Sequence, residues 1–296
     1  MQVNPSMLST TKGATVPATP GPGVRRRYVG KTLRRLREAC DMRVSAVAKK
    51  LGISQPSLTR IENGRNAIMA RHVYKLCEIY SVSKRDTDRL IRLAEESRER
   101  GWWESYSDVI SDWFEIYASL EADADQILIY ESEFVPGLFQ TSGYIRAGFQ
   151  AGNPEASEAA GHRVVDLRQA RQLRLQDHDI TALVNEGAVR RVVGGPDVMR
   201  NQLEYLITVI EKQHANIQIV PFSAGAHAAM GGPFYMLKFP DVDEIDLVHV
   251  ENERGGMYFE RSSDLLRYAD VFARTQQVAL SPTDSVALLR KIAQEM

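Results

Sequence analysis

Apolar residues recur at every third or fourth position over the first third of the chain, a spacing typical of amphipathic helices. Val29, Leu33 and Leu36, for example, form one stripe that ends at Cys40. Five stripes of this kind predict five short helices, at about 28–40, 44–51, 54–63, 70–80 and 84–100. Their close succession favours one compact helical unit.

The residues between the second and third helices carry turn and capping signals. Gly52 suits the left-handed backbone that commonly follows a helix end. Ser54 is a good N-cap, and Pro56 falls in the first helical turn, where a missing N–H costs little. Asn63-Gly64 then ends the third helix. Two short helices joined by a glycine-containing turn predict a helix-turn-helix.

The remainder of the chain alternates between strand-like and helical patterns. Short apolar runs predict five strands, at 126–131, 180–184, 217–221, 234–239 and 246–250. Helical patterns predict an aromatic helix over 113–121 and further helices at about 141–150, 154–176, 196–213, 262–279 and 282–295. Strands separated by helices indicate an α/β or α+β domain around one sheet, although the pattern does not give the strand order.

These patterns divide the chain into four parts. We expect a disordered tail rich in Pro, Gly, Ser and Thr over 1–27, an all-α five-helix helix-turn-helix domain over 28–95, a connecting helix over 96–112, and a larger α/β (or α+β) domain over 113–296. Arg25-Arg26-Arg27 closes the tail. This triplet is expected either to contact a minor groove or phosphates, or to be the solvated start of the first helix.

The net charge of −1 hides a strong asymmetry. Residues 25–71 carry 13 Lys or Arg against three acids, a net charge of +10, whereas the rest of the chain carries −11. A basic block on an otherwise acidic protein is the footprint of a polyanion-binding module. Together with the helix-turn-helix pattern, it indicates double-stranded DNA as the partner.

The apolar runs and the cysteine content indicate the cellular compartment. No run of apolar residues is long enough to cross a membrane, and the N-terminus lacks the apolar segment of a secretory signal. Two cysteines, Cys40 and Cys77, do not make a disulfide framework. We therefore expect a cytoplasmic protein that contacts no membrane.

The segment from Val44 to Gly64 strongly resembles the repressor-type helix-turn-helix of the xenobiotic-response-element (Cro/repressor-like) family. Ala48 permits close helix crossing, and Gly52 makes the turn. The apolar core positions are Leu51, Ile53, Leu58 and Ile61. The family often has a Gln at the start of the first motif helix, where it contacts the DNA backbone; here that place holds Val44, and Arg43 is the candidate replacement.

The resemblance implies that the second motif helix enters the major groove with its N-terminal residues leading. The residues expected to read bases there are Gln55, Pro56, Thr59 and Arg60. Gln pairs bidentately with adenine and Arg with guanine, while Pro and the Thr methyl pack on thymine methyls. Alternatively, Gln55 is a solvated helical residue and Arg60 makes a surface ion pair near Glu62. The residues expected to contact phosphates are Arg43, Lys49, Ser54, Ser57, Asn63, Arg65 and Asn66.

The larger region resembles the uncharacterised domain that follows the helix-turn-helix in WhiJ-like regulators of actinobacteria. The similarity covers roughly 105–290, and the motifs that carry it are Val135–Thr141 with Tyr144, Glu186–Arg191, Gln202-Leu203, Val220–Phe222 with Gly225–His227, Gly232–Phe234 and Val250-Glu251. It implies a transcriptional regulator, often encoded beside a small partner protein in an antitoxin–toxin-like arrangement. It supplies no ligand and no catalytic residues. Since helix-turn-helix modules usually bind as dimers, we expect this region to hold a homodimer together.

Enzymatic chemistry has little support in the sequence. The motifs of nucleophile elbows, P-loops, zinc proteases and dinucleotide-binding folds are missing, and no Cys/His set has metal-site spacing. The only plausible acid–base residues are Glu186, His227, His249 and Glu251, which are expected to be structural. Glu121, Asp123 and Asp125 alternate like a cation loop but are expected to be a solvated helix end.

The sequence therefore predicts no catalytic site, no cofactor and no metal. Three interpretations of the larger domain stay open. It senses a small partner protein, which is the favoured interpretation, or it binds a small-molecule effector, or it is an enzyme tethered to DNA.

Overall fold

The computed structural model describes residues 22–97, 102–106, 108–110, 112–122, 124–175, 178–239, 246–252 and 255–296. Most of the expected tail, residues 1–21, lies outside the described residues. The first helix, α1, spans Pro22–Ala39 and so begins earlier than the periodicity indicated. The boundary of the tail at residue 27 was therefore wrong, because Arg25, Arg26 and Arg27 are already helical.

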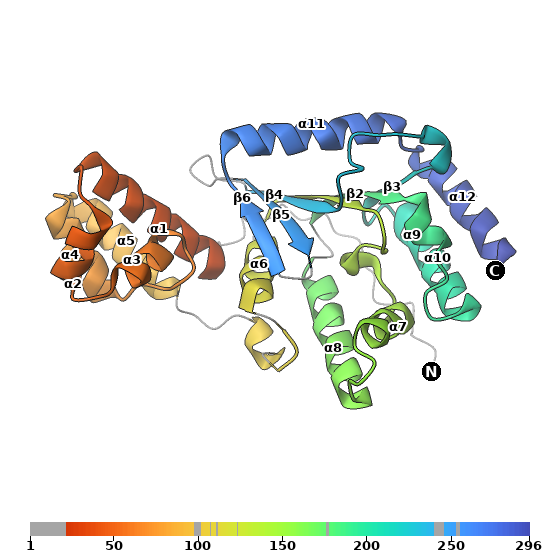
Figure 1. Cartoon of the computed structure of the whole chain (residues 1–296), viewed down its shortest axis with the longest axis horizontal. Helices are drawn as coiled ribbons and strands as arrows, with labels where there is room; N and C mark the ends of the chain where they lie inside the picture. The colour runs from red at the N-terminus through yellow and green to blue at the C-terminus, as the bar shows by residue number, and fades with distance from the viewer. Residues whose placement is uncertain are drawn as a thin grey trace.

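Five helices make the N-terminal domain, as the apolar stripes predicted. After α1 come α2 (Val44–Leu51), α3 (Gln55–Glu62), α4 (Ala70–Ile79) and α5 (Lys84–Glu96). Their inward faces share one core, to which every helix contributes, including Val29, Leu33, Val47, Leu58, Leu76 and Leu90. In Figure 1 this domain forms a separate body beside the β6 edge of the larger domain.

The link between the two domains is not the continuous helix that was expected over 96–112. Helix α5 ends at Glu96, and the next described element is a short 3-10 helix, η1 (Trp102–Tyr106). Helix α6 then begins at Asp112 and ends at Ala122. Trp102 and Trp103 pack edge to face within η1, with ring centroids 6.1 Å apart.

The larger domain is built on a six-stranded mixed sheet. The strands are β1 (Gln126–Glu131), β2 (Asp179–Asn185), β3 (Asn216–Val220), β4 (Phe234–Lys238), β5 (Leu247–Asn252) and β6 (Gly255–Phe259), in the order β3-β2-β1-β4-β5-β6. β1, β2 and β3 are parallel, whereas β4, β5 and β6 continue the sheet antiparallel. The α/β prediction is thus confirmed. β6 was missed because it begins with two glycines and has no buried residue.

Helices cover both faces of this sheet (Figure 1). α11 (Ser262–Val278) lies along one face and contributes Phe272 to a core with Tyr130 and Phe234. The other face carries the remaining helices, which are α6, α7 (Ser142–Gly152), α8 (Glu158–Arg174), the short α9 (Glu186–Arg190), α10 (Pro196–Glu211) and α12 (Pro282–Glu295).

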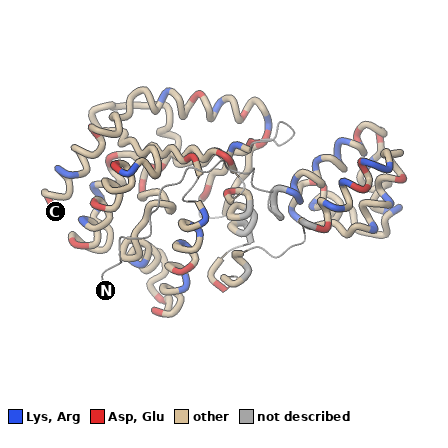
Figure 2. The backbone as a smooth tube through the Cα atoms, turned by 180° about the vertical axis from the view of Figure 1, so that it is seen from behind, with Lys and Arg blue, Asp and Glu red and all other residues tan. Residues whose placement is uncertain are grey.

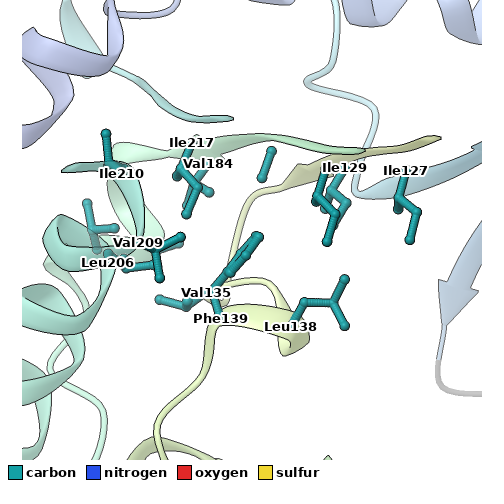
Figure 3. Close-up of a cluster of buried hydrophobic side chains, with 14 of the residues drawn as sticks. Ile127, Ile129, Val135, Leu138, Phe139, Val184, Leu206, Val209, Ile210 and Ile217 are labelled. Atoms are coloured by element: carbon teal, nitrogen blue, oxygen red, sulfur yellow. The ribbon is translucent and has the colours of Figure 1, made fainter. Parts of the chain in front are cut away.

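The main core of the domain lies on this second face. Figure 3 shows Ile127 and Ile129 of β1 and Val184 of β2 pointing toward Leu138 and Phe139 of the 3-10 helix η2 (Gly137–Phe139). α10 closes the same cluster with Leu206, Val209 and Ile210. Burial of such aliphatic side chains contributes roughly 1.5–3 kcal/mol each, so this cluster holds α10 against the sheet.

Candidate nucleic-acid interface and the buried groups of the larger domain

Local capping positions the N-terminal end of α3. Gly52 adopts the left-handed backbone with φ of 72°, which ends α2 and turns the chain. The Ser54 Oγ accepts a hydrogen bond from the Ser57 backbone N–H at 3.2 Å, so Ser54 is the N-cap that the sequence predicted. Pro56 lies in the first turn. The helix therefore begins at a defined residue and presents its first turn to solvent.

The two faces of α3 differ sharply in exposure. Leu58, Ile61 and Glu62 are buried against the rest of the domain. The four residues expected to read bases are all exposed, and they follow helical spacing on the opposite face: Gln55, Pro56, Thr59 and Arg60. The Thr59 hydroxyl donates to the Gln55 carbonyl at 3.1 Å, which leaves the Thr59 methyl group for apolar contact.

Glu62 is engaged away from Arg60. Its carboxylate accepts two hydrogen bonds from the Arg37 guanidinium, at 2.7 and 3.0 Å, and both side chains are buried. The hydrogen bond to Glu62 raises the pKa of Arg37, which stays charged. Glu62 is therefore already engaged and does not serve as the partner in the surface ion pair that was the alternative role of Arg60. Sequence reasoning missed the Arg37–Glu62 pair. A signal was present, because Glu62 lies on the same helical face as the apolar Leu58, and an acid on a buried face needs a cation as its partner.

Two glycines bring α1 into direct backbone contact with the C-terminal end of α3. A Cβ on Gly30 would lie 2.3 Å from the Ile61 carbonyl oxygen. Gly64 has φ of +67°, and a Cβ there would lie 2.7 Å from the Cα of Arg27. Neither position has room for a side chain, so the backbone of α1 packs directly against the C-terminal end of α3.

The residues expected to contact phosphates surround α3. Arg43 is the N-cap residue of α2 and Lys49 lies in its last turn; both are exposed, while Val44 is half-buried. The others precede, begin or follow α3: Ser54, Ser57, Asn63, Arg65 and Asn66, of which all but the half-buried Ser57 are exposed. Figure 2 shows Lys and Arg distributed over the helices of this domain.

The arginine triplet Arg25-Arg26-Arg27 was expected either to contact DNA or to be the solvated start of the first helix, and the structure gives it other contacts. Arg25 and Arg27 are buried, so a solvated helix start is wrong for both. The Arg27 guanidinium pairs with Glu260 at 2.8 Å and lies over the Phe239 ring, 5.7 Å from its centroid. Arg26 donates to the Ser97 carbonyl at 3.1 Å. Arg27 thus contacts the larger domain, whereas Arg26 bonds to the C-terminal end of α5 within its own domain.

Three of the four candidate acid–base residues of the larger domain have described local neighbours, and the fourth, Glu251, is exposed. Glu186 pairs with Arg190 at 2.6 Å and accepts from the Phe222 backbone N–H at 2.7 Å. His249 is buried against the Tyr117 ring, 4.5 Å between centroids, and burial lowers its pKa to about 4. His227 packs edge to face on Tyr130.

Glu121 is not part of a solvated helix end. It is buried, and the Arg171 guanidinium donates to it twice, at 2.5 and 2.6 Å. The Tyr117 hydroxyl donates to the same carboxylate at 2.6 Å. The expectation for Glu121 was wrong because its partner lies fifty residues away in sequence; Asp123 lies outside the described residues, and Asp125 is exposed.

Two known families match the chain, one in each of the two domains. The family described as Helix-turn-helix domain matches residues 29–90. The family described as Domain of unknown function (DUF5753) matches residues 114–291, more than half of the chain. The chain belongs to the DUF5753 family. No curated protein and no solved structure matches the chain significantly.

The helix-turn-helix domain indicates a DNA-binding regulator. None of the helices in the described ranges is long and apolar enough to cross a membrane. Over the same ranges, no cluster of three or more His, Cys, Asp or Glu side chains has the arrangement of a metal site.

The DUF5753 domain holds a cavity of about 560 Å³ between η2, α8 and α10. Its walls are mainly apolar, with Leu138, Phe139, Leu175, Ile180 and Val209 among the lining residues. The lining residues that carry polar or charged groups are Gln169, Gln172, Tyr205, Thr208, Lys212 and His214. The volume falls within the roughly 300–1,000 Å³ of small-molecule sites, whose walls are mainly apolar.

A partly buried carboxyl makes the stability of the DUF5753 domain depend on pH. Burial raises the pKa of Glu131 to about 7, although the Tyr235 hydroxyl donates to it at 2.5 Å. In the unfolded chain this carboxyl ionises near its ordinary pKa of about 4.3. Between these two values the folded state keeps a proton that the unfolded state releases, so stability is lost as pH rises from about 4.5 to 7.

Glu131→Gln is therefore expected to raise the free energy of unfolding at pH 8 by on the order of 2–3 kcal/mol and to change it little at pH 4.5. The glutamine keeps an acceptor for the Tyr235 hydroxyl but carries no charge. Urea unfolding followed by circular dichroism at both pH values measures the effect. Glu133→Gln is the matched control, because Glu133 is exposed and pairs with Arg191 at the surface. An equal gain at both pH values would contradict the buried charge as its cause.

Proposed function

We propose that this protein is a sequence-specific transcriptional regulator of the Cro/repressor-like type, in which α3 reads bases in the major groove. The observation that carries the proposal is the exposed row of Gln55, Pro56, Thr59 and Arg60 on a helix with a capped, accessible N-terminus. Arg37 and the close contact with α1 hold the opposite face of that helix. A rigid helix with an exposed polar face is suited to direct readout.

Phosphate contacts would supply most of the affinity. The surrounding exposed groups are Arg43, Lys49, Ser54, Asn63, Arg65 and Asn66, together with Ser57. They belong to the segment with net charge +10, which favours a polyanion. Each neutralised phosphate steepens the dependence of log affinity on log salt by about 0.9.

Gln55→Ala is expected to reduce discrimination at one base pair by about 1–3 kcal/mol while most non-specific affinity remains. The experiment is fluorescence anisotropy with DNA segments from around the protein's own gene, at several salt concentrations. Lys49→Ala is the contrasting variant, because loss of a phosphate contact should weaken binding to all sequences and lower the salt slope by about 1.

Tight binding by the wild type to one segment, with preference lost in Gln55→Ala, supports readout by α3. Equal, weak and purely salt-dependent binding to every segment by the wild type would overturn the proposal. Tyr74→Ala serves as a surface control, since Tyr74 is 54% exposed on α4 rather than α3.

The assembly that follows from this function is a homodimer held by the DUF5753 domain, because paired half-sites mirror a two-fold protein. The resemblance to WhiJ-like regulators supports an antitoxin-like role in which a small partner protein, encoded nearby, modulates operator binding. No catalytic step is part of this proposal. Light scattering at micromolar concentration tests the dimer, and a monomeric mass contradicts it.

A small-molecule effector is a second candidate for the role of the DUF5753 domain, favoured by the apolar cavity of about 560 Å³. The probe is the apolar dye 8-anilinonaphthalene-1-sulfonate, added to the folded full-length chain. Thr208→Trp should fill the cavity and reduce dye binding, because Thr208 lines it. Glu204→Trp, one turn earlier on α10 and not among the lining residues, is the control. Equal dye binding by both variants would argue against this site.

A further inference from the structure

The cavity of about 560 Å³ in the DUF5753 domain runs along one face of α10. That helix lines it with Tyr205, Thr208 and Val209, which together with Lys212 follow the i, i+3, i+4, i+7 spacing of a single helical face. At a rise of about 1.5 Å per residue, this face extends for about 10 Å. The cavity therefore follows the helix to its C-terminal end, where Lys212 lies.

Large apolar side chains of this cavity remain in contact with solvent. Leu173 of α8 is 67% exposed and Tyr205 of α10 is 37% exposed, and both line the cavity. The inner wall consists of buried side chains, among them Leu138, Phe139 and Ile180. Because removing apolar surface from water is favourable, an apolar ligand chain would be stabilised between these residues.

Three polar side chains of the walls are already engaged by the protein. The Gln169 side-chain amide donates to the Ser142 hydroxyl at 3.0 Å, and the Gln172 side-chain amide donates to two backbone carbonyls at η2, at 3.1 and 2.9 Å. The Thr208 hydroxyl donates to a backbone carbonyl one turn earlier on α10, at 2.9 Å. The donors of these three side chains therefore belong to the walls, and the charged groups at the end of α10 are better placed to bind a ligand head group.

A tight turn brings Lys212 and His214 to the same end of the cavity. The backbone N–H groups of Lys212, Gln213 and His214 donate to the last carbonyls of α10, at 3.0 to 3.1 Å. Gln213 has the left-handed φ of 55° that glycine usually adopts after a helix. Non-glycine residues held in this conformation are costly and cluster at functional sites. The turn ends α10 and leaves both side chains lining the cavity.

None of the described residues that line the cavity is an acid. Glu211, next to Lys212 in sequence, accepts from the Arg290 guanidinium at 2.5 Å. Asp179, at the start of β2, accepts from the Gln126 side-chain amide at 2.6 Å. The charge of Lys212 is therefore available to a ligand. Since Lys212 is exposed at the mouth of the cavity, a charged head group bound there would stay partly in water.

We propose that this cavity binds an amphipathic carboxylate, such as a medium-chain fatty acid, with its chain along the apolar walls and its carboxylate at Lys212 and His214. The proposal deepens the effector role proposed above for the DUF5753 domain and rests on it. A carboxylate accepts hydrogen bonds from ammonium and imidazole groups, and such charge-assisted bonds are stronger than neutral ones. A neutral amphiphile would use the walls alone, and a cationic one would be repelled by Lys212.

The test is isothermal titration calorimetry of the full-length chain at neutral pH with three probes that share one alkyl chain: octanoate, octan-1-ol and octylamine. The variants are Lys212→Met, which removes the charge at the mouth, and Thr208→Trp, which fills the cavity. Lys291→Met is the matched control, because Lys291 is exposed on α12 and is not among the lining residues. Circular dichroism checks that every variant is folded.

Octanoate is expected to bind roughly fivefold more tightly than octylamine, at the upper end of what an exposed ion pair contributes. Lys212→Met should remove most of this preference and leave the binding of octan-1-ol unchanged. Lys291→Met should change neither, and Thr208→Trp should weaken the binding of all three probes. A preference of the wild type for octylamine, or an unchanged preference for octanoate in Lys212→Met, would overturn the proposal.

The same titrations separate the ligand class from the effector role. Equal binding of the three probes by the wild type, abolished in Thr208→Trp, would overturn the carboxylate and leave the cavity as an effector site. Absence of binding by all three probes, with equal dye binding by Thr208→Trp and Glu204→Trp, would overturn both. The titrations contain no DNA, so they do not bear on base readout by α3.

Discussion

Gly30→Ala is expected to destabilise the helix-turn-helix domain by about 3 kcal/mol or more and to abolish tight operator binding. The added Cβ would lie 2.3 Å from the Ile61 carbonyl oxygen and 3.1 Å from the Glu62 carbonyl oxygen. Both atoms belong to the backbone of α3, so no side-chain rotation relieves the clash and α1 must separate from α3. The gain of about 1 kcal/mol from replacing a helical glycine by alanine is smaller than this cost.

Native-state hydrogen exchange of the Leu58 and Ile61 amides, with anisotropy on the operator, measures both consequences. Gly148→Ala is the control, because Gly148 is also helical and a Cβ there meets nothing within 4 Å. It should be neutral or slightly stabilising. If the two alanine variants behaved alike, the close contact between α1 and α3 would not be what positions the recognition helix.

Local rules account for most of the elements that the sequence predicted. Gly52 and Ser54 define the turn before α3 through their own backbone and side-chain chemistry, which needs no distant partner. The five expected strands were found because each carries a buried apolar run. β6 escaped because its glycines and half-buried residues give no such run.

Partners that lie far apart in sequence escaped for a different reason. The Arg37–Glu62 pair and the contact of Arg27 with Glu260 depend on which elements pack together, and periodicity within one element does not contain that information. Arg27 therefore looked like a candidate DNA contact, since a basic triplet before a helix is compatible with both roles. The ion pair between Arg27 and Glu260 decides between these two roles.

Gly137 is a position whose neighbours the sequence does not predict. It is the first residue of η2, the 3-10 helix that follows β1. The structure adds that Gly137 is buried, and a Cβ would lie 2.9 Å from Nη1 of Arg168 and 3.2 Å from Nη1 of Arg171. Two guanidinium groups thus lie directly against the backbone beneath the sheet.

Arg171 is held there by Glu121, and the pair gives the largest effect expected in the DUF5753 domain. Both side chains are buried, and the bidentate contact of 2.5 and 2.6 Å is completed by the Tyr117 hydroxyl. Arg171→Met should cost about 3–5 kcal/mol, because it leaves the Glu121 carboxylate buried without a cation. Urea unfolding of the full-length chain, followed by circular dichroism, measures the loss.

The double variant Arg171→Met with Glu121→Leu removes both charges. It therefore separates the contribution of the ion pair to the free energy of unfolding from the cost of leaving one buried charge without a partner. Because well-packed apolar residues often replace a buried pair with little loss, the double variant should be more stable than Arg171→Met alone. Arg200→Met is the control, since Arg200 pairs with Asp197 at the surface and exposed pairs contribute little. Additive losses in the double variant would mean that Arg171 stabilises the domain through packing of its stem, with no dependence on the Glu121 charge.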